Sequence, residues 1–65
     1  MRLWLKMKII STYGSQVKFA RACGKTDDWI SRIITGRRNP NSKERELIVS
    51  KLGVNYEEEL FLEQS

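Results

Sequence analysis

Between residues 16 and 36, hydrophobic residues recur in two short runs, each with the spacing of one helix face. The first run consists of Val17, Phe19, Ala20 and Cys23, and the second of Ile30, Ile33 and Ile34. Such spacing is typical of amphipathic helices. Gly24 lies between the runs and can adopt a positive φ angle without a Cβ penalty. We therefore expect two helices that cross closely at Ala20 and Gly24 and form a helix-turn-helix unit.

The N-terminal segment has its own apolar face. Leu3, Met7 and Ile10 fall on one side of a helix, with Trp4 beside them. We expect an amphipathic first helix from about Leu3 to Thr12, with these residues as its apolar side.

Capping residues mark the other helix ends. The expected starts and ends are Ser15 and Cys23 for the second helix, Thr26 and Thr35 for the third, Asn41 and Gly53 for the fourth, and Asn55 and Phe61 for the fifth. Ser, Thr and Asn accept hydrogen bonds from the free amides of a helix start, and Gly often follows a helix end. Glu44 and Glu58, three positions after their Asn caps, complete two capping boxes. In the fourth helix, Leu47, Ile48 and Leu52 are expected to face inward.

The 65 residues predict one all-α domain, residues 1–65, with five helices. One cysteine and no histidine exclude a zinc site and a histidine-dependent triad, so we expect no metal, no cofactor and no enzyme activity. Cys23 is expected to be a small buried residue in a reducing, cytoplasmic compartment. Lys6 and Lys8 interrupt the N-terminal apolar run, so we expect neither a signal peptide nor a membrane span.

Charge is distributed unevenly along the chain. Residues 15–43 contain seven Lys and Arg against two Asp, whereas residues 44–65 contain two against six Glu. A basic region that coincides with a helix-turn-helix pattern is expected of a protein that binds the phosphate backbone of DNA. The alternative is that these side chains only solvate the surface.

The joint pattern resembles the Cro/cI (XRE) family of helix-turn-helix transcriptional regulators, with their lambda-repressor-like fold. The matching residues are Gly14-Ser15-Gln16, Phe19-Ala20, Gly24, Thr26, Ile30-Ser31-Arg32-Ile33, Gly36, Pro40, Ile48 and Leu52-Gly53-Val54. The resemblance implies a bacterial or phage regulator, repressor-like, that binds a double-stranded DNA operator. Its recognition helix, about Thr26–Thr35, would enter the major groove.

The resemblance also implies which residues touch DNA. The expected base contacts are Asp27, Asp28, Trp29 and Arg32, and the expected phosphate contacts are Gln16, Lys25, Thr26, Ser31, Arg37, Arg38 and Lys43. Arg32 is the best candidate for guanine, because a guanidinium can pair with both O6 and N7. Several have an alternative role. Arg32 could pair with Asp28, Asp27 and Asp28 could be first-turn residues that the helix dipole favours, and Trp29 could pack. Gln16 could simply be an exposed residue at a helix start.

The sequence leaves two points open: which surface forms a dimer, and whether the partner is DNA or another protein. A regulator of this size is expected to be a weak homodimer, through Tyr56, Leu60 and Phe61 or through Trp4 and Leu5. Leu60 and Phe61 could instead close the core. The alternative function is a protein-interaction module, antirepressor-like or antitoxin-like, that uses the Asp27–Trp29 surface.

Overall fold

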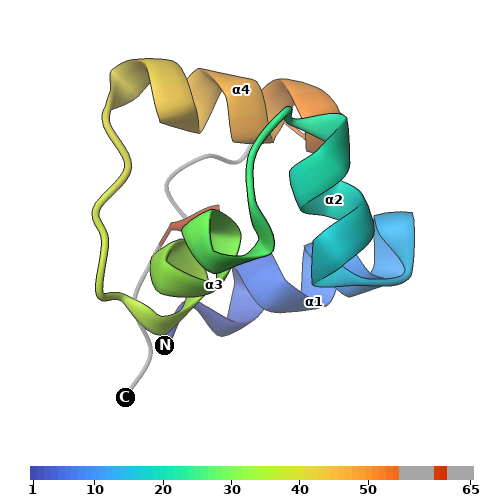
Figure 1. Ribbon diagram of the computed structural model, residues 1–65, viewed down its shortest axis with the longest axis horizontal. Helices are drawn as coiled ribbons and strands as arrows, with labels where there is room; N and C mark the ends of the chain where they lie inside the picture. Colours follow the sequence, from blue (N-terminus) through green and yellow to red (C-terminus); the bar gives the residue numbers. More distant parts are fainter. Residues whose placement is uncertain (55–59, 62–65) are drawn as a thin grey trace.

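The computed structural model describes residues 1–54, 60 and 61, and within them it contains four α-helices and no strand (Figure 1). The helices are α1 (Leu3–Tyr13), α2 (Gln16–Ala22), α3 (Asp27–Thr35) and α4 (Ser42–Leu52). The predicted all-α class is confirmed. Most of the predicted fifth helix falls on residues 55–59, which lie outside the described residues.

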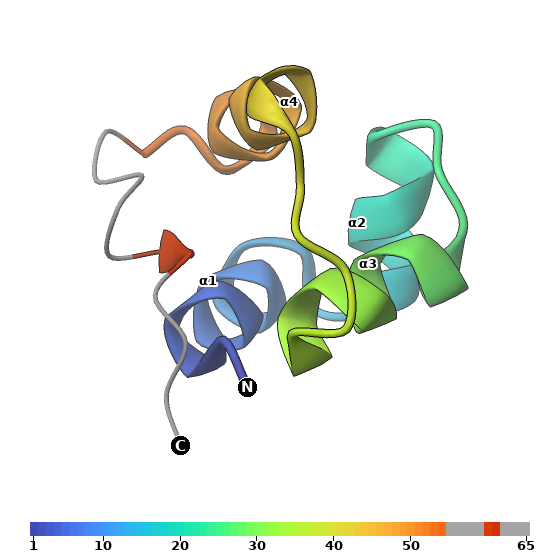
Figure 2. The same ribbon diagram turned by 90° about the vertical axis from the view of Figure 1, so that its left-hand side faces the viewer.

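The helices surround one hydrophobic core. Figures 1 and 2 show α4 on one side of the molecule and α1 on the opposite side, with α3 beside α1. α2 packs against both α1 and α3. The fully buried side chains of the core are Leu5, Ile9, Phe19, Ala20, Ile30, Ile33, Ile34, Ile48 and Leu60. Cys23 is also buried, as predicted, and burial raises the pKa of its thiol.

The predicted caps of α2, α3 and α4 are confirmed. The side chains of Ser15, Thr26 and Asn41 each accept a hydrogen bond from the backbone N–H three residues later. Gly24 has a φ angle of +72°, and the N–H of Lys25 donates to the Ala20 carbonyl at 2.9 Å to close the turn. A Cβ atom at Gly24 would meet nothing within 4 Å. The expected close crossing at Gly24 is therefore wrong, and the backbone conformation alone requires glycine there.

The apolar side that the sequence predicted for α1 is not the side that meets the core. Leu5 and Ile9 are fully buried, whereas Leu3, Met7 and Ile10 are 42–53% exposed. α1 has two apolar faces, and the spacing in the sequence does not say which one meets the core. The buried face continues to Tyr13, whose ring packs edge-on against Phe19 with the ring centres 5.1 Å apart.

The C-terminal apolar residues belong to the core. Leu60 is fully buried and Phe61 is 6% exposed. This confirms the alternative that these two residues close the core, and it removes them from the predicted association surface. Leu5 leaves that surface for the same reason, while Trp4 stays exposed and Tyr56 lies outside the described residues.

Arg2 joins three distant parts of the chain. Its side chain is almost entirely buried, and its guanidinium donates to the carbonyls of Ile33, Arg38 and Phe61 and to Oδ1 of Asn39. One side chain thus connects the end of α3, the loop after it and the C-terminal segment. No spacing or capping signal in the sequence marks Arg2 as a buried side chain.

The burial of Ala20 leads to a testable expectation. Ala20 is 1% exposed on α2, which packs against both α1 and α3. Ala20→Leu should lower the free energy of unfolding by about 1–3 kcal/mol, because extra methylene groups in a filled core force its neighbours apart. Thermal unfolding followed by circular dichroism measures the loss. Ala22→Leu, on the same helix but half-buried, is the matched control. Equal melting temperatures for the two variants would mean that α2 is not closely packed at Ala20.

Candidate nucleic-acid interface

α3 separates its apolar and polar residues cleanly. Ile30, Ile33 and Ile34 are buried, whereas the opposite side carries the exposed Asp28, Arg32 and Thr35, and Asp27 is exposed as the first residue of the helix. Two acidic residues in the first turn suit the positive end of the helix dipole. Thr26, predicted to contact phosphate, caps the helix by accepting a hydrogen bond from the Trp29 N–H at 3.2 Å. The structure thus gives α3 one polar side that is open to solvent.

Arg32 and Asp28 form an ion pair on this open side. Nε of Arg32 lies 2.9 Å from Oδ2 of Asp28, and the two side chains are 62% and 70% exposed. The predicted alternative of an Asp28–Arg32 pair is therefore present in the free protein. Exposed pairs of this kind are worth at most about 1 kcal/mol. The pair consequently holds Arg32 in place without preventing it from exchanging partners.

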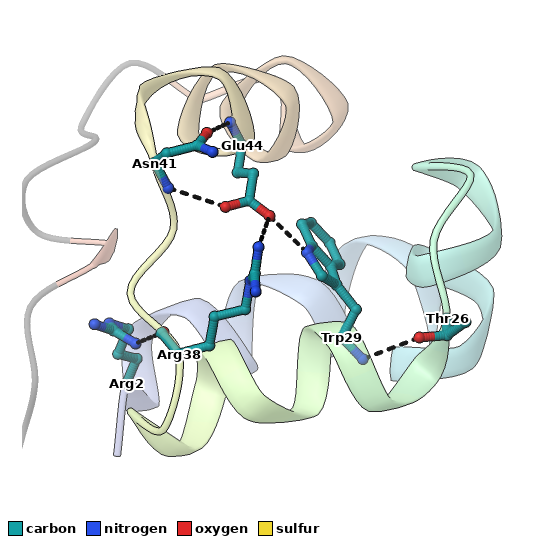
Figure 3. Close-up of polar contacts among 6 residues, drawn as sticks. All are labelled: Arg2, Thr26, Trp29, Arg38, Asn41 and Glu44. Carbon is teal, nitrogen blue, oxygen red and sulfur yellow. Dashed lines mark hydrogen bonds and ion pairs between the residues drawn. The ribbon is translucent and has the colours of Figure 1, made fainter.

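Trp29 points in a different direction. Figure 3 shows its indole reaching from α3 toward α4, where Nε1–H donates to Oε2 of Glu44 at 2.8 Å. Nη2 of Arg38 approaches the same carboxylate oxygen at 2.8 Å. The Lys25 ammonium lies 5.7 Å from the centre of the indole ring. The half-buried Trp29 therefore binds α3 to α4, which is the packing role that the sequence left open for it.

Glu44 is fully engaged inside the domain. Its other oxygen, Oε1, accepts from the N–H of Asn41 at 3.0 Å, and its own N–H donates to Oδ1 of Asn41 at 2.9 Å. The Asn41 backbone bond, followed by the Trp29 and Arg38 bonds, lowers the pKa of Glu44 from 4.5 to about 2. The capping box could be read from the sequence. The bonds to Trp29 and Arg38 could not, because they depend on how α3 and α4 pack.

The other predicted phosphate contacts are distributed over the fold. Lys25 is exposed in the turn before α3, and Arg37 and Arg38 are exposed in the loop that follows it. Cations thus flank both ends of α3. Two further members are placed on other helices: the half-buried Gln16 is the first residue of α2, and the exposed Lys43 is the second residue of α4. The half-buried Ser31 is on α3 itself.

Five of the predicted residues lie on the exposed part of α3 or next to its ends, and we call them the α3 surface: Lys25, Asp27, Asp28, Arg32 and Arg37. Arg38 lies at its edge, with a side chain that is 46% exposed and a guanidinium that is already bonded to Glu44. A phosphate contact by Arg38 would therefore be made by a side chain that Glu44 already orients.

The described residues give no sign of a metal site or a membrane-spanning helix. They include no group of three or more Cys, Asp or Glu side chains placed to hold a metal ion. No helix among them has the length and apolar character needed to cross a membrane. Comparison with known proteins adds no relative: no family model, no curated protein and no solved structure matches the chain.

Proposed function

We propose that this protein is a sequence-specific double-stranded DNA-binding regulator that presents α3 to the major groove. The observation that carries the proposal is the α3 surface, an open polar helix side with cations at both ends. An α-helix fits the major groove, and flanking Lys and Arg neutralise the phosphates on either side of it. The separation of the buried isoleucines from this polar side leaves α3 free to approach DNA without disturbing the core.

Within this proposal, Arg32 reads a base. Its ion pair with Asp28 occupies Nε, and the two Nη groups at the end of the guanidinium are the ones that pair with O6 and N7 of guanine. Asp28 then orients Arg32. Its carboxylate is repelled by phosphate, which disfavours binding positions that bring this part of α3 against the DNA backbone. Arg37 and Lys25 contact the backbone, which adds affinity on every sequence.

The alternative function, a protein-interaction module that uses the Asp27–Trp29 surface, would need Trp29 to be available to a partner. Trp29 donates its only polar hydrogen to Glu44 and is half-buried between α3 and α4. The Asp27–Trp29 surface then offers a partner mainly two carboxylates. A salt titration of binding to random-sequence DNA separates the two functions, because each phosphate contact should contribute about 0.9 to the slope of log K against log salt. Absence of salt-dependent binding would favour the protein partner.

Arg32→Ala should weaken binding to the preferred DNA site by about 1–3 kcal/mol and should affect random DNA much less. The preferred site is first selected from a random duplex library, and affinities are then measured by fluorescence anisotropy. Arg21→Ala, an exposed arginine on α2 outside the α3 surface, is the matched control. Equal losses on selected and random DNA would reassign Arg32 to the phosphate backbone.

A further inference from the structure

The outer side of α1 is unusual among the exposed surfaces of the described residues. Five of the six large hydrophobic side chains that stay exposed there belong to residues 1–10, namely Met1, Leu3, Trp4, Met7 and Ile10. The sixth, Val17, is on α2. Nearly a third of the whole chain is charged, yet the outward arc of α1 from Leu3 to Ser11 carries no charge. A helix that is apolar on both sides is expected to be covered on both sides.

The charged residues of α1 stand at the borders of this arc. Lys6 and Lys8 are half-buried, each between the core side and the outer side. Their ammonium groups can extend past the edge of a contact while their methylene stems line it. The uncharged outer side, which we call the α1 face, consists of Leu3, Trp4, Met7, Ile10 and Ser11.

We propose that the α1 face binds a second copy of this chain, with the two α1 helices antiparallel and Met7 at the two-fold axis. On a helix with 3.6 residues per turn, Met7 lies in the middle of the face, Leu3 and Ile10 along one edge, and Trp4 and Ser11 along the other. A two-fold axis through Met7 places Leu3 beside Ile10 of the second copy. The same rotation places the large Trp4 beside the small Ser11 of the second copy, and the pattern is thus complementary to itself.

The size of the α1 face sets the strength of the dimer. Four large side chains, each about half exposed, offer on the order of 400 Å² per copy, a patch size that often marks an association site. Two copies together bury about 800 Å², which is below the roughly 1,200 Å² of a stable complex. The dimer is therefore weak in solution, and two linked DNA half-sites would strengthen it by holding the copies close together. The contact itself depends on the α1 face alone and not on DNA binding.

Sedimentation equilibrium without DNA tests the proposal directly. The wild-type protein should show a reversible monomer–dimer equilibrium in the micromolar-to-millimolar range. Met7→Glu should weaken that association at least tenfold, because two carboxylates would meet at the axis. Val17→Glu, which places the same charge at another exposed hydrophobic position outside the α1 face (42% exposed, against 53% for Met7), should leave it unchanged. Circular dichroism confirms that both variants are folded.

Cross-linking tests the axis. Met7→Cys should form a disulfide-linked dimer readily under mild oxidation, since a residue on a two-fold axis faces its own copy. Val17→Cys measures the background from the buried Cys23. Wild-type protein that stays monomeric at millimolar concentration, or equal cross-linking of the two variants, would overturn the proposal. Binding of monomeric wild type to anionic phospholipid vesicles, lost in Met7→Glu, would assign the α1 face to a membrane surface instead and would also overturn it.

Discussion

Replacement of Arg2 by alanine should lower the free energy of unfolding by about 2–4 kcal/mol. The Arg2 guanidinium is almost wholly buried and donates to three backbone carbonyls and one side-chain oxygen. Alanine removes the donors and leaves the carbonyls of Ile33 and Phe61, whose bonds are buried, without them inside the protein. The total stability of a 65-residue domain is on the order of 3–10 kcal/mol. Loss of this one side chain is therefore expected to leave a marginally folded protein.

Urea unfolding followed by circular dichroism measures the effect. Arg2→Lys should recover only part of the stability, because one ammonium group cannot reach all the acceptors that are spread around the edge of the planar guanidinium. Lys8→Ala, a change of similar size at a half-buried position on α1, is the control. A loss below about 0.5 kcal/mol for Arg2→Ala, the range of ordinary surface substitutions, would show that the buried bonds contribute little.

Glu44→Ala should have the second largest effect, a loss of about 2–3 kcal/mol at neutral pH. It removes half of the capping box of α4 and the acceptor for both Trp29 and Arg38. The half-buried indole N–H of Trp29 then lacks its partner. Glu46→Ala, an exposed position on the same helix, is the matched control and should change stability by less than about 0.5 kcal/mol. Similar losses for the two variants would mean that the bonds between α3 and α4 contribute nothing measurable.

The same carboxylate predicts how stability depends on pH. The pKa of Glu44 is about 2 in the folded protein and near 4.5 in the unfolded chain. Between these values the unfolded chain binds more protons, so the contribution of Glu44 is complete above about pH 4.5 and is lost as the pH falls toward 2. Urea unfolding at pH 7, 4 and 2.5 should show this decline in wild type and a smaller one in Glu44→Gln. Parallel declines would place the acid sensitivity elsewhere.

Much of the fold could be read from the sequence, because local signals determine helix ends. The caps at Ser15, Thr26 and Asn41 and the buried isoleucines of α3 are all where the spacing predicted them. The orientation of α1 could not be read, since Leu3-Met7-Ile10 and Leu5-Ile9 are both acceptable apolar faces. Only packing against the other helices selects between them.

For the candidate site, the exposed positions could be predicted from the sequence, but the contacts between helices could not. The sequence identified the exposed residues of α3 and the cations around it, because polar residues opposite an apolar face must point outward. It could not identify the internal partners of Trp29 and Arg38, which come from Glu44, 15 and 6 positions away. Contacts between helices depend on the distance and angle at which the helices pack, and the local spacing of residues along the sequence does not show these.

The bonds of Arg2 also bear on the kinetics of this domain. They connect positions 31 to 59 residues apart, whereas the turn between α2 and α3 closes within a few residues. Long loops are costly to close before the rest of the chain is ordered. We therefore infer that the Arg2 bonds form after the folding transition state and act mainly on the unfolding rate. Arg2 would then determine how long a folded molecule survives between openings, and hence how quickly a protease that outpaces reclosing can cleave it.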